Sequence, residues 1–365
     1  MILSEFLIPS KSYASLRGPE DTIVLSSRAR LARNLRHASF PSFAKKTERL
    51  RVFKQIRDAV LKLNGMEACF VEGMGNLSSD EKTALVERHL ISREHAARGA
   101  GSGLVINKDE NISVMINEED HLRMQAILPG FQIRQAWERI DQVDTELEQN
   151  IEYAFHPKYG YLTACPTNVG TGIRVSAMIH LPALALTDQI RQIIGAVDKL
   201  GLTVRGIYGE GTDALGNLFQ ASNQQTLGET EDAIVTRLEK VIRQVVINEE
   251  NARQTLLEEE GQKTLLNNIG RAWGILSNCY MIETQETLNL LSFVRLGVDL
   301  GMFPNSDREI VNELFLITQK GHLQMMKGTM EDQKRDQIRA EILREKTVLL
   351  GAPRKVKVVS KGGKK

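Results

Sequence analysis

The sequence has few cysteines and no apolar run long enough to cross a bilayer. Three of its 365 residues are cysteines, Cys69, Cys165 and Cys279, and they lie far apart. A disulfide framework and a Cys-x-x-Cys metal site are therefore excluded, which favours a reducing compartment. No apolar stretch approaches the roughly 18 residues that span a membrane, and the first residues lack the basic segment and cleavage site of a signal peptide. We expect a cytoplasmic protein that does not enter membranes.

An excess of charge of either sign is also missing. The chain has 47 Lys and Arg against 46 Asp and Glu, a formal net charge of +1. Six of the basic residues lie in the last twelve positions, so the rest of the chain is slightly acidic. An acidic body argues against nucleic-acid binding as the main function. Residues 351–365, which end in Gly-Gly-Lys-Lys, predict a basic flexible tail.

Several common catalytic motifs are absent as well. The sequence contains no G-x-x-x-x-G-K-S/T loop, no G-x-G-x-x-G, no H-E-x-x-H and no G-x-S-x-G. The usual nucleotide-binding, metalloprotease and hydrolase motifs are therefore excluded. A nucleotide site here would need arginines that converge from separate segments, because each guanidinium is permanently charged and offers a planar pair of donors to phosphate oxygens.

The composition that remains is that of an ordinary globular protein, with 42% hydrophobic and 25% charged residues. Because single cores stop growing at roughly 250–300 residues, a chain of this length predicts two domains. Strand-like and helix-like patterns alternate up to about Glu229, and amphipathic helical patterns follow up to about Leu350. We therefore predict an α+β fold: residues 1–255 form an antiparallel sheet flanked by helices, and residues 256–350 form an all-helical domain.

The elements follow from local patterns. The expected strands, rich in β-branched or aromatic residues, are Cys69–Glu72, Ser102–Ile106, Val114–Asn117, Leu162–Cys165, Arg174–Leu181 and Thr203–Tyr208. The expected helices, with apolar residues at three- and four-residue intervals, are Glu48–Leu63, Ser79–Leu90, Ala136–Ile151 and Asp188–Leu200. An apolar stripe with Leu288, Leu291, Val294 and Val298 predicts pairing with a second copy of the chain. Alternatively, the stripe only seals the helices against the rest of the chain.

Four segments supply arginines that could converge on a polyphosphate: they are Ser26–Arg33, Asn117–Arg123, Cys165–Arg174 and Arg205–Gly211. In an extended segment Arg28 and Arg30 point to the same face, as a phosphate clamp requires. Taken singly, each segment also has an ordinary interpretation: a solvated arginine, an acidic turn or an inert core cysteine.

Taken together, the ordered set resembles the catalytic domain of the phosphagen (guanidino) kinases. The resemblance runs from about Ser26 to about Gly228, and its most specific strings are N-E-E-D-H-L-R and C-P-T-N-x-G-T. It implies that Glu119 and Glu210 hold the guanidinium of the acceptor and that Cys165 is the active-site cysteine. It also implies ATP as a cofactor, with Mg²⁺ bound mainly by the ATP phosphates and water, because no dedicated carboxylate cage is visible.

The same resemblance implies a set of nucleotide-binding residues. The arginines expected on the phosphates are Arg28, Arg30, Arg123, Arg174 and Arg205, with His89 near the nucleotide. The remaining residues expected in the nucleotide site are Ser27, Val175, Ser176, Ala177, Met178, Gly206, Ile207, Tyr208 and Gly209.

Two departures from the phosphagen kinases decide the acceptor. Only 25 residues precede Ser26, where those kinases carry a small helical domain, and a helical block follows at the C-terminal end. This arrangement resembles the bacterial protein arginine kinases, which implies that the acceptor is an arginine side chain in a protein. The string Arg335-Asp336-Gln337-Ile338-Arg339-Ala340 is similar to the R-D-x-x-R-A element by which that family binds phosphoarginine away from the active site. On a helix, Arg335 and Arg339 share a face.

The leading hypothesis is therefore an ATP-dependent kinase of protein arginine that marks proteins for regulated proteolysis. Two alternatives stay open: a kinase of a small free guanidino compound, and a phosphoarginine-binding adaptor without catalysis. The resemblance implies protein substrates with exposed arginine, an activating adaptor protein, and a Clp-type unfoldase and protease as partners. It also suggests a homodimer or higher homo-oligomer.

Overall fold

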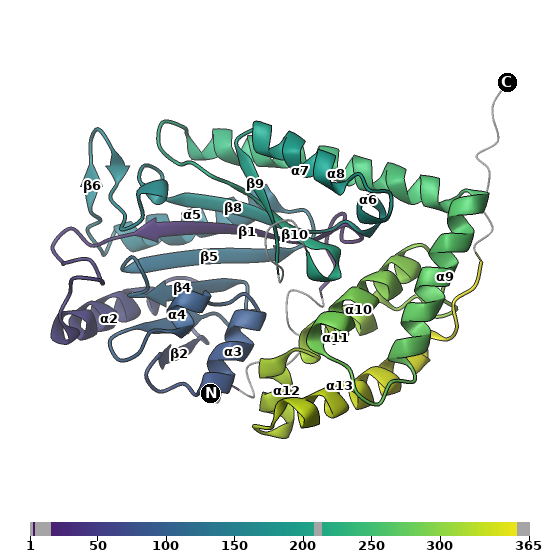
Figure 1. Cartoon of the computed structure of the whole chain (residues 1–365). Helices are drawn as coiled ribbons and strands as arrows, with labels where there is room; N and C mark the ends of the chain where they lie inside the picture. The colour runs from purple at the N-terminus through teal and green to yellow at the C-terminus, as the bar shows by residue number, and fades with distance from the viewer. Residues whose placement is uncertain (1–2, 4–15, 208–213, 356–365) are drawn as a thin grey trace.

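The structure, a computed structural model, describes residues 3, 16–207 and 214–355, without the side chains of residues 259 and 260. A large sheet occupies the first two thirds of the chain, and the last third is helical (Figure 1). The sheet has eight strands in the order β2-β3-β4-β5-β1-β8-β10-β9, and each neighbouring pair is antiparallel. The predicted α+β class, an antiparallel sheet flanked by helices and followed by a helical block, is thereby confirmed.

The elements have the following bounds. The strands of the large sheet are β1 (Val24–Arg33), β2 (Phe70–Gly73), β3 (Gly103–Ile106), β4 (Ile112–Ile116), β5 (Leu122–Pro129), β8 (Ile173–His180), β9 (Leu202–Gly206) and β10 (Leu218–Asn223). A separate hairpin consists of β6 (Phe155–His156) and β7 (Gly160–Tyr161). The helices of the first part are α2 (Lys46–Val60), α3 (Ser79–Glu87), α4 (Arg93–Ala96), α5 (Ile133–Glu148), η3 (Pro166–Asn168), α6 (Pro182–Leu186), α7 (Ile190–Lys199), η4 (Leu215–Asn217) and α8 (Glu231–Leu257). The C-terminal helices are α9 (Glu259–Leu276), α10 (Thr284–Asp299), α11 (Arg308–Ile317), α12 (Lys320–Lys327), α13 (Asp332–Thr347) and η5 (Val348–Leu350).

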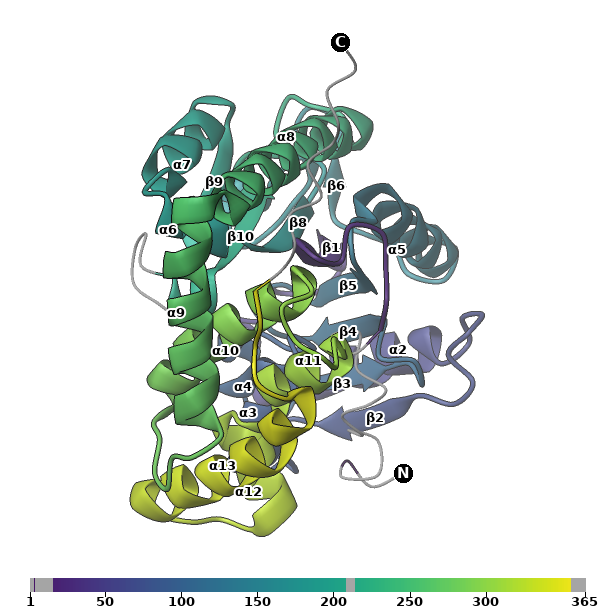
Figure 2. The same ribbon diagram turned by 90° about the vertical axis from the view of Figure 1, so that its right-hand side faces the viewer.

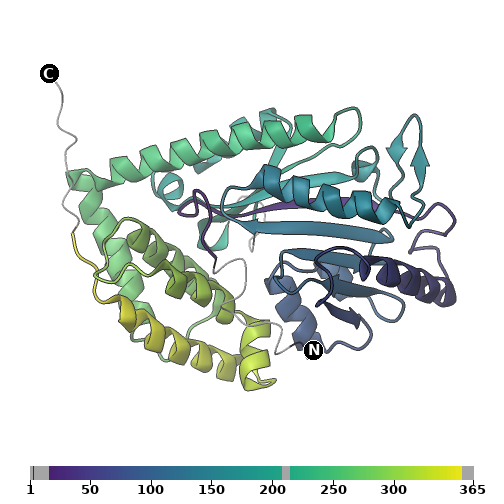
Figure 3. The ribbon, with the colours of Figure 1, turned by 180° about the vertical axis from the view of Figure 1, so that it is seen from behind.

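The sheet separates a buried face from a charged one. Side chains alternate between the two faces of a strand, and in β1 the apolar Ala29 and Leu31 are fully buried while Arg28 and Arg30 face the other side. Helices α5 and α8 cover the apolar face (Figure 3). The main core therefore lies behind the sheet, and the arginine face stays available for a site.

Most predicted elements exist, and the differences lie among the strands; the hairpin β6–β7 is one that the sequence patterns do not predict. Each predicted helix overlaps an observed one: α2, α3, α5 and α7. Strands β5 and β10 are not among the predicted strands, and β1 is foreseen only as an extended segment. The predicted strand Leu162–Cys165 is wrong, because this stretch is an irregular loop whose Ala164 N–H donates to the Asp120 carboxylate at 2.6 Å instead of joining a ladder.

The C-terminal helices form a core of their own. Helix α8 ends at Leu257 and α9 turns away at Glu258, whose ψ of 158° leaves the helical range (Figure 2). The stripe Leu288, Leu291, Val294 and Val298 lies inside this core, at most 4% exposed. The prediction that this stripe pairs with a second copy is therefore wrong, because the chain's own helices bury it.

Helix α12 of the C-terminal block contacts the first part of the chain directly. Helix α12 packs on α3 so closely that a Cβ added to Gly321 would lie 2.5 Å from the Ala84 nitrogen. The Glu87 carboxylate accepts hydrogen bonds from the backbone N–H groups of Gly321 (2.7 Å) and His322 (3.1 Å). A carboxylate at a helix N-terminus stabilises the helix, so Glu87 fixes α12 to the end of α3.

Within the described parts of the chain, no helix is both long and apolar enough to cross a membrane. The three cysteines are free thiols.

Candidate active site

Five arginines from four strands line one cavity of about 650 Å³ on the charged face of the sheet. They are Arg28, Arg30, Arg123, Arg174 and Arg205, the set predicted from the sequence. Glu87 and His89 line the cavity from the side of α3, and Gln319 reaches it from the start of α12. The structure thus brings together arginines that lie up to 177 positions apart in the sequence.

Strand register explains why these arginines meet. Directly opposed residues of antiparallel strands point to the same face. Arg30 of β1 lies opposite Arg174 of β8, and Arg123 of β5 lies opposite Ala32, two residues after Arg30. Arg205 of β9 lies opposite Gln220 of β10, which continues the same row.

The arginines crowd one another, which prepares the cavity for an anion. Burial, followed by the charges of Arg28, Arg123 and Arg174, lowers the pKa of Arg30 well below its usual value. Burial and the charge of Arg205 similarly lower the pKa of Arg174. Among the described residues, the Nε atoms of Arg30 and Arg174 are buried without a hydrogen-bond partner. Because a buried donor without an acceptor costs free energy, a polyphosphate would supply what these groups lack.

Three further side chains hold the arginines in place. Arg28 Nη2 donates to Gln220 Oε1 at 3.1 Å, and Arg174 Nη2 donates to Ser222 Oγ at 3.2 Å. Arg123 Nη1 donates to both carboxylate oxygens of the buried Glu118, at 2.9 and 2.7 Å. These partners are not among the residues predicted from the sequence, although strand register places Gln220 and Ser222 on the face of the arginines.

The two neighbouring glutamates of the N-E-E-D turn differ. Burial would raise the pKa of Glu118, but Arg123 and a hydrogen bond from Ser92 outweigh it and the pKa is lowered. Glu119 is exposed, and partial burial together with Asp120 raises its pKa. Glu118 is therefore fixed against Arg123, whereas the Glu119 side chain remains accessible to solvent.

His89 is a neutral residue of the cavity wall. It has a positive φ of 57°, which turns the chain sharply after α3. Burial, then the charges of Arg28 and Arg30, lowers its pKa to about 3. At neutral pH this histidine therefore adds no charge to the arginine cavity.

The other predicted nucleotide residues divide between the two faces of the sheet. Ser176 and Met178 line a small recess next to Arg28 and His89, together with Ser26. The predicted Ser27 faces the opposite side, where its hydroxyl donates to the Gly130 carbonyl at 2.8 Å. The side chains of Val175 and Ala177 are fully buried in the core behind the sheet. Gly206 and Ile207 line the arginine cavity, whereas Tyr208, Gly209 and Glu210 lie outside the described residues.

The loop with Cys165 is tied to the turn with Glu119. The Asp120 carboxylate accepts from Ala164 N and from Asn34 Nδ2, both at 2.6 Å. Cys165 follows Ala164, and its Sγ lies 3.0 Å from Thr167 Oγ1. Asp120 therefore fixes the loop that carries the thiol, a role that the sequence interpretation misses.

The predicted phosphoarginine residues lie on α13, away from the cavity. Arg339 is fully buried: its Nη1 donates to Asp336 at 2.5 Å and to the Ile282 carbonyl at 2.7 Å. Arg335 donates to Asp332 at 2.7 Å, and Ala340 is fully buried. In the described part of the chain, Arg335 Nε and Arg339 Nη2 are buried without an acceptor.

A metal-binding cluster is not found: the residues that the structure describes contain no group of three or more His, Cys, Asp or Glu placed to hold an ion.

Comparison with known proteins defines the class. Residues 51–252 match the model of the ATP:guanido phosphotransferase C-terminal catalytic domain. The duplicated taurocyamine kinase of Schistosoma mansoni has a similar structure, with 28% identity and a TM-score of 0.56, covering 65% of this chain and 35% of that one. Lombricine kinase aligns with 25% identity and a TM-score of 0.56, covering 67% and 70% of the two chains. The fold is thus that of the ATP:guanido phosphotransferases, and the chain belongs to that family.

The helical block decides the branch of that family. Residues 262–357 match the model of the protein-arginine kinase McsB C-terminal domain. The chain is 46% identical to the protein-arginine kinase of Halothermothrix orenii, over 90% of this chain and 94% of that one. It is 45% identical to the protein-arginine kinase of Bacillus subtilis, over 92% and 93% of the two chains. The chain belongs to the protein-arginine kinases.

Proposed function

We propose that the arginine cavity binds the phosphates of ATP and that the γ-phosphoryl group is transferred to an arginine side chain of a protein, presented from the side of Glu119 and Cys165. The observation that carries this proposal is the row of five arginines on one sheet face, two of them with buried N–H groups that lack an acceptor. The small recess with Ser26, Ser176 and Met178 adjoins the cavity at His89 and marks the side on which we place the adenosine.

The acceptor chemistry requires carboxylates. A guanidinium has a pKa of roughly 12.5–13.8 and no free lone pair, so transfer needs an oriented acceptor that loses a proton. Glu119, with its raised pKa, is suited to accept that proton. Glu210 would complete a pair of carboxylates on the guanidinium, and the thiolate of Cys165 would add a third anionic contact near Arg174. The arginines then neutralise the charge of the phosphates, so the catalysis is mainly positioning and electrostatics.

Mg²⁺ would be bound here by the nucleotide and not by protein carboxylates. The buried carboxylate of Glu118, beside the arginines, is already bound to Arg123. We therefore assign the ion to the ATP phosphates and water, where it neutralises phosphate charge.

Variants of the acceptor residues test the assignment. Glu210→Gln and Glu119→Gln should each lower kcat roughly 10²–10⁴-fold, the usual range for a general base. Cys165→Ser tests whether the thiolate contributes to turnover. Arg28→Ala should instead abolish ATP binding. Phosphate on protein arginine is measured as acid-labile label, and ATP binding by calorimetry. Normal turnover of both glutamine variants would remove the two carboxylates from the mechanism.

We further propose that α13 binds phosphoarginine. Arg335 Nε and Arg339 Nη2 supply two buried donors on one helix face, which suits one phosphate group. Asp336 holds Arg339 from the same helix. Ala340 closes the buried side of this turn.

The cellular role proposed here rests on the family. Phosphoarginine would mark proteins in the cytoplasm for a Clp-type unfoldase and protease, an adaptor protein would activate the kinase, and the chain would act as a homodimer or higher homo-oligomer. Degradation of a labelled protein by such a protease, with and without prior phosphorylation, tests the mark. Equal degradation rates would refute it.

A further inference from the structure

The large sheet ends in a strand whose outer edge faces a cavity. Among the described residues β9 pairs with β10 alone, so it is an edge strand. The Ile207 N–H donates to the Leu218 carbonyl at 3.1 Å, in the same register as the opposed pair Arg205 and Gln220. Because backbone groups of an antiparallel strand point alternately to one neighbour and then the other, the N–H and C=O groups of Val204 and Gly206 point away from β10.

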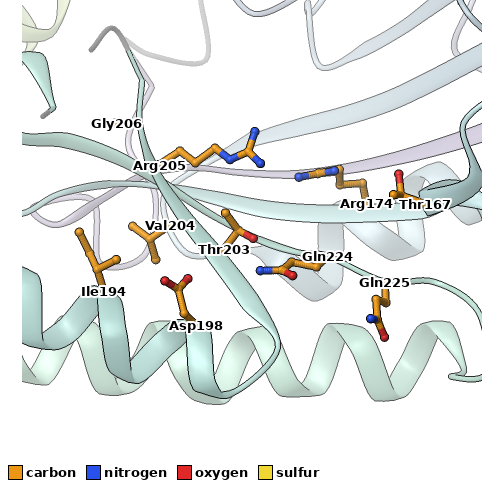
Figure 4. A pocket seen from close by; sticks show the side chains of 10 residues that line it. All are labelled: Thr167, Arg174, Ile194, Asp198, Thr203, Val204, Arg205, Gly206, Gln224 and Gln225. Atoms are coloured by element: carbon orange, nitrogen blue, oxygen red, sulfur yellow. The ribbon is translucent and has the colours of Figure 1, made fainter. Parts of the chain in front are cut away.

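A cavity of about 1060 Å³ runs along this edge (Figure 4). Its lining includes Thr203, Val204, Arg205 and Gly206, four consecutive residues of β9. Consecutive residues of a strand point to opposite faces of the sheet, so a cavity that touches all four passes over the edge itself. Figure 4 shows Arg205 on one side of the strand and Asp198 of α7 on the other.

The edge cavity is continuous with the arginine cavity. Arg174, Arg205 and Gly206 line both. Thr167, whose hydroxyl contacts Cys165, lines the edge cavity at the same end. A polypeptide lying along β9 would therefore carry an arginine side chain toward the place where the phosphoryl group is transferred.

The far end of the free edge is closed. Gln224 Nε2 donates to the Leu202 carbonyl at 3.2 Å, which satisfies the outward group of the first residue of β9. The opposite edge of the sheet, β2, differs because its outward Gly73 N–H is bound by Glu72 at 2.9 Å. Among the described residues, the outward backbone groups of Val204 and Gly206 have no hydrogen-bond partner, and they lie next to the arginine cavity.

We propose that the protein substrate binds by adding a short extended strand to the free edge of β9, with the acceptor arginine next to it in the chain. Backbone hydrogen bonds supply the affinity in this mode of recognition, and side-chain pockets add preference. Asp198 is the acidic side chain of the edge cavity and would favour a substrate with a second basic residue. The inference rests on the proposed acceptor site and names how a protein reaches it.

Backbone methylation of a substrate peptide tests the proposal on the unaltered enzyme. The peptide carries one arginine, and its amides are N-methylated one at a time. Methylation at alternate positions should raise KM about tenfold, the equivalent of one or two lost backbone hydrogen bonds, while the positions between them have little effect. Equal sensitivity at all positions, or none, would overturn the proposal. Failure to phosphorylate the unmethylated peptide would instead contradict the proposed function.

A proline variant tests the edge from the side of the enzyme. Val204→Pro removes an N–H that the β10 ladder does not use, and proline is tolerated on edge strands. It should raise KM for the peptide about tenfold with unchanged ATP affinity. The matched control is Val71→Pro on the β2 edge, whose N–H also points outward because Met74 bonds to Ser102 in the same register. Unchanged peptide KM in a folded Val204→Pro, or a change only in self-association, would overturn the proposal.

Discussion

At the scale of single residues, the site contains two neighbouring glutamates, Glu118 and Glu119, in different environments. Glu118 is buried and bound to Arg123, whereas its neighbour Glu119 is exposed and has a raised pKa. The same residue type thus takes two roles one position apart, because successive residues of the turn face different surroundings. Arg123 is held by Glu118 and lines the arginine cavity.

The first prediction concerns Arg123. Arg123→Lys keeps the charge but loses the planar donor pair, so we expect ATP affinity to fall at least about tenfold. Titration calorimetry with ATP measures this, and thermal unfolding confirms that the variant is folded. Arg134→Lys is the matched control, because Arg134 makes an exposed ion pair on α5. An ATP Kd equal to that of the control would exclude Arg123 from the phosphate site.

The second prediction concerns acid stability. His121 accepts from the Leu35 N–H, faces the Ser39 carbonyl, and burial lowers its pKa from 6.5 to about 4. Between these values the unfolded chain binds a proton that the folded chain does not, so stability is lost as pH falls from 6.5 toward 4, by at most about 1.4 kcal/mol per pH unit.

Urea unfolding at several pH values checks this. His121→Gln should be less stable at neutral pH but should depend less steeply on pH, whereas the exposed control His156→Gln should keep the original slope. Equal slopes for wild type and His121→Gln would show that this histidine does not couple to folding.

The limits of sequence interpretation are visible at this scale. The motif strings are sufficient to select the five arginines, because fork geometry and charge are properties of the residue type. They do not tell Ser26 from Ser27, since only the strand register decides which hydroxyl faces the cavity. Glu118 and Asp120 look like part of an acidic turn, and their partners Arg123 and Ala164 become neighbours only in the folded chain.

At the scale of elements, helices are predictable and the central strands less so. The helices have a periodic apolar face that can be read from the sequence. Strands β1 and β5 contain only one β-branched residue each, so the composition that marks a strand is missing from them. The loop Leu162–Cys165 is apolar enough for a strand, but Asp120 takes its backbone N–H. A side chain distant in sequence thus overrides local propensity.

The third prediction tests the contact between α3 and α12. Gly321→Ala inserts a methyl group against Ala84 and should destabilise the protein by roughly 1–3 kcal/mol, as overpacking does. Because Glu87 and Gln319 line the arginine cavity at this contact, ATP affinity should fall as well. Gly274→Ala on α9 is the control: no atom lies within 4 Å of the added carbon, and replacing a helical glycine stabilises by roughly 0.5–1 kcal/mol. Equal effects of the two variants on the free energy of unfolding would contradict the close packing.

The fourth prediction concerns α13. Free phosphoarginine should bind wild type and should not bind Arg335→Ala/Arg339→Ala, because the two buried donors are lost. Affinity and kinase rate are measured in the same titration, since a ligand changes activity only through unequal affinity for two states. Undiminished binding by the double variant would place the ligand elsewhere. Lost binding with an unchanged rate would make α13 a docking element and not a regulator.

At the scale of the whole molecule, the arrangement of domains decides the kind of acceptor. The nucleotide is expected on a rigid sheet face, and the helical block packs at one side through α12 and α10. The edge cavity along β9 has room for a polypeptide. A site of this shape suits an arginine that belongs to a chain better than a small free molecule.

The most direct measurement compares two acceptors under the same conditions, with labelled ATP and Mg²⁺: free L-arginine and an unfolded protein rich in arginine. We expect acid-labile phosphate on arginine of the protein, its loss in Glu210→Gln, and little or no label on the free amino acid. Efficient labelling of free L-arginine with none on the protein would contradict this expectation.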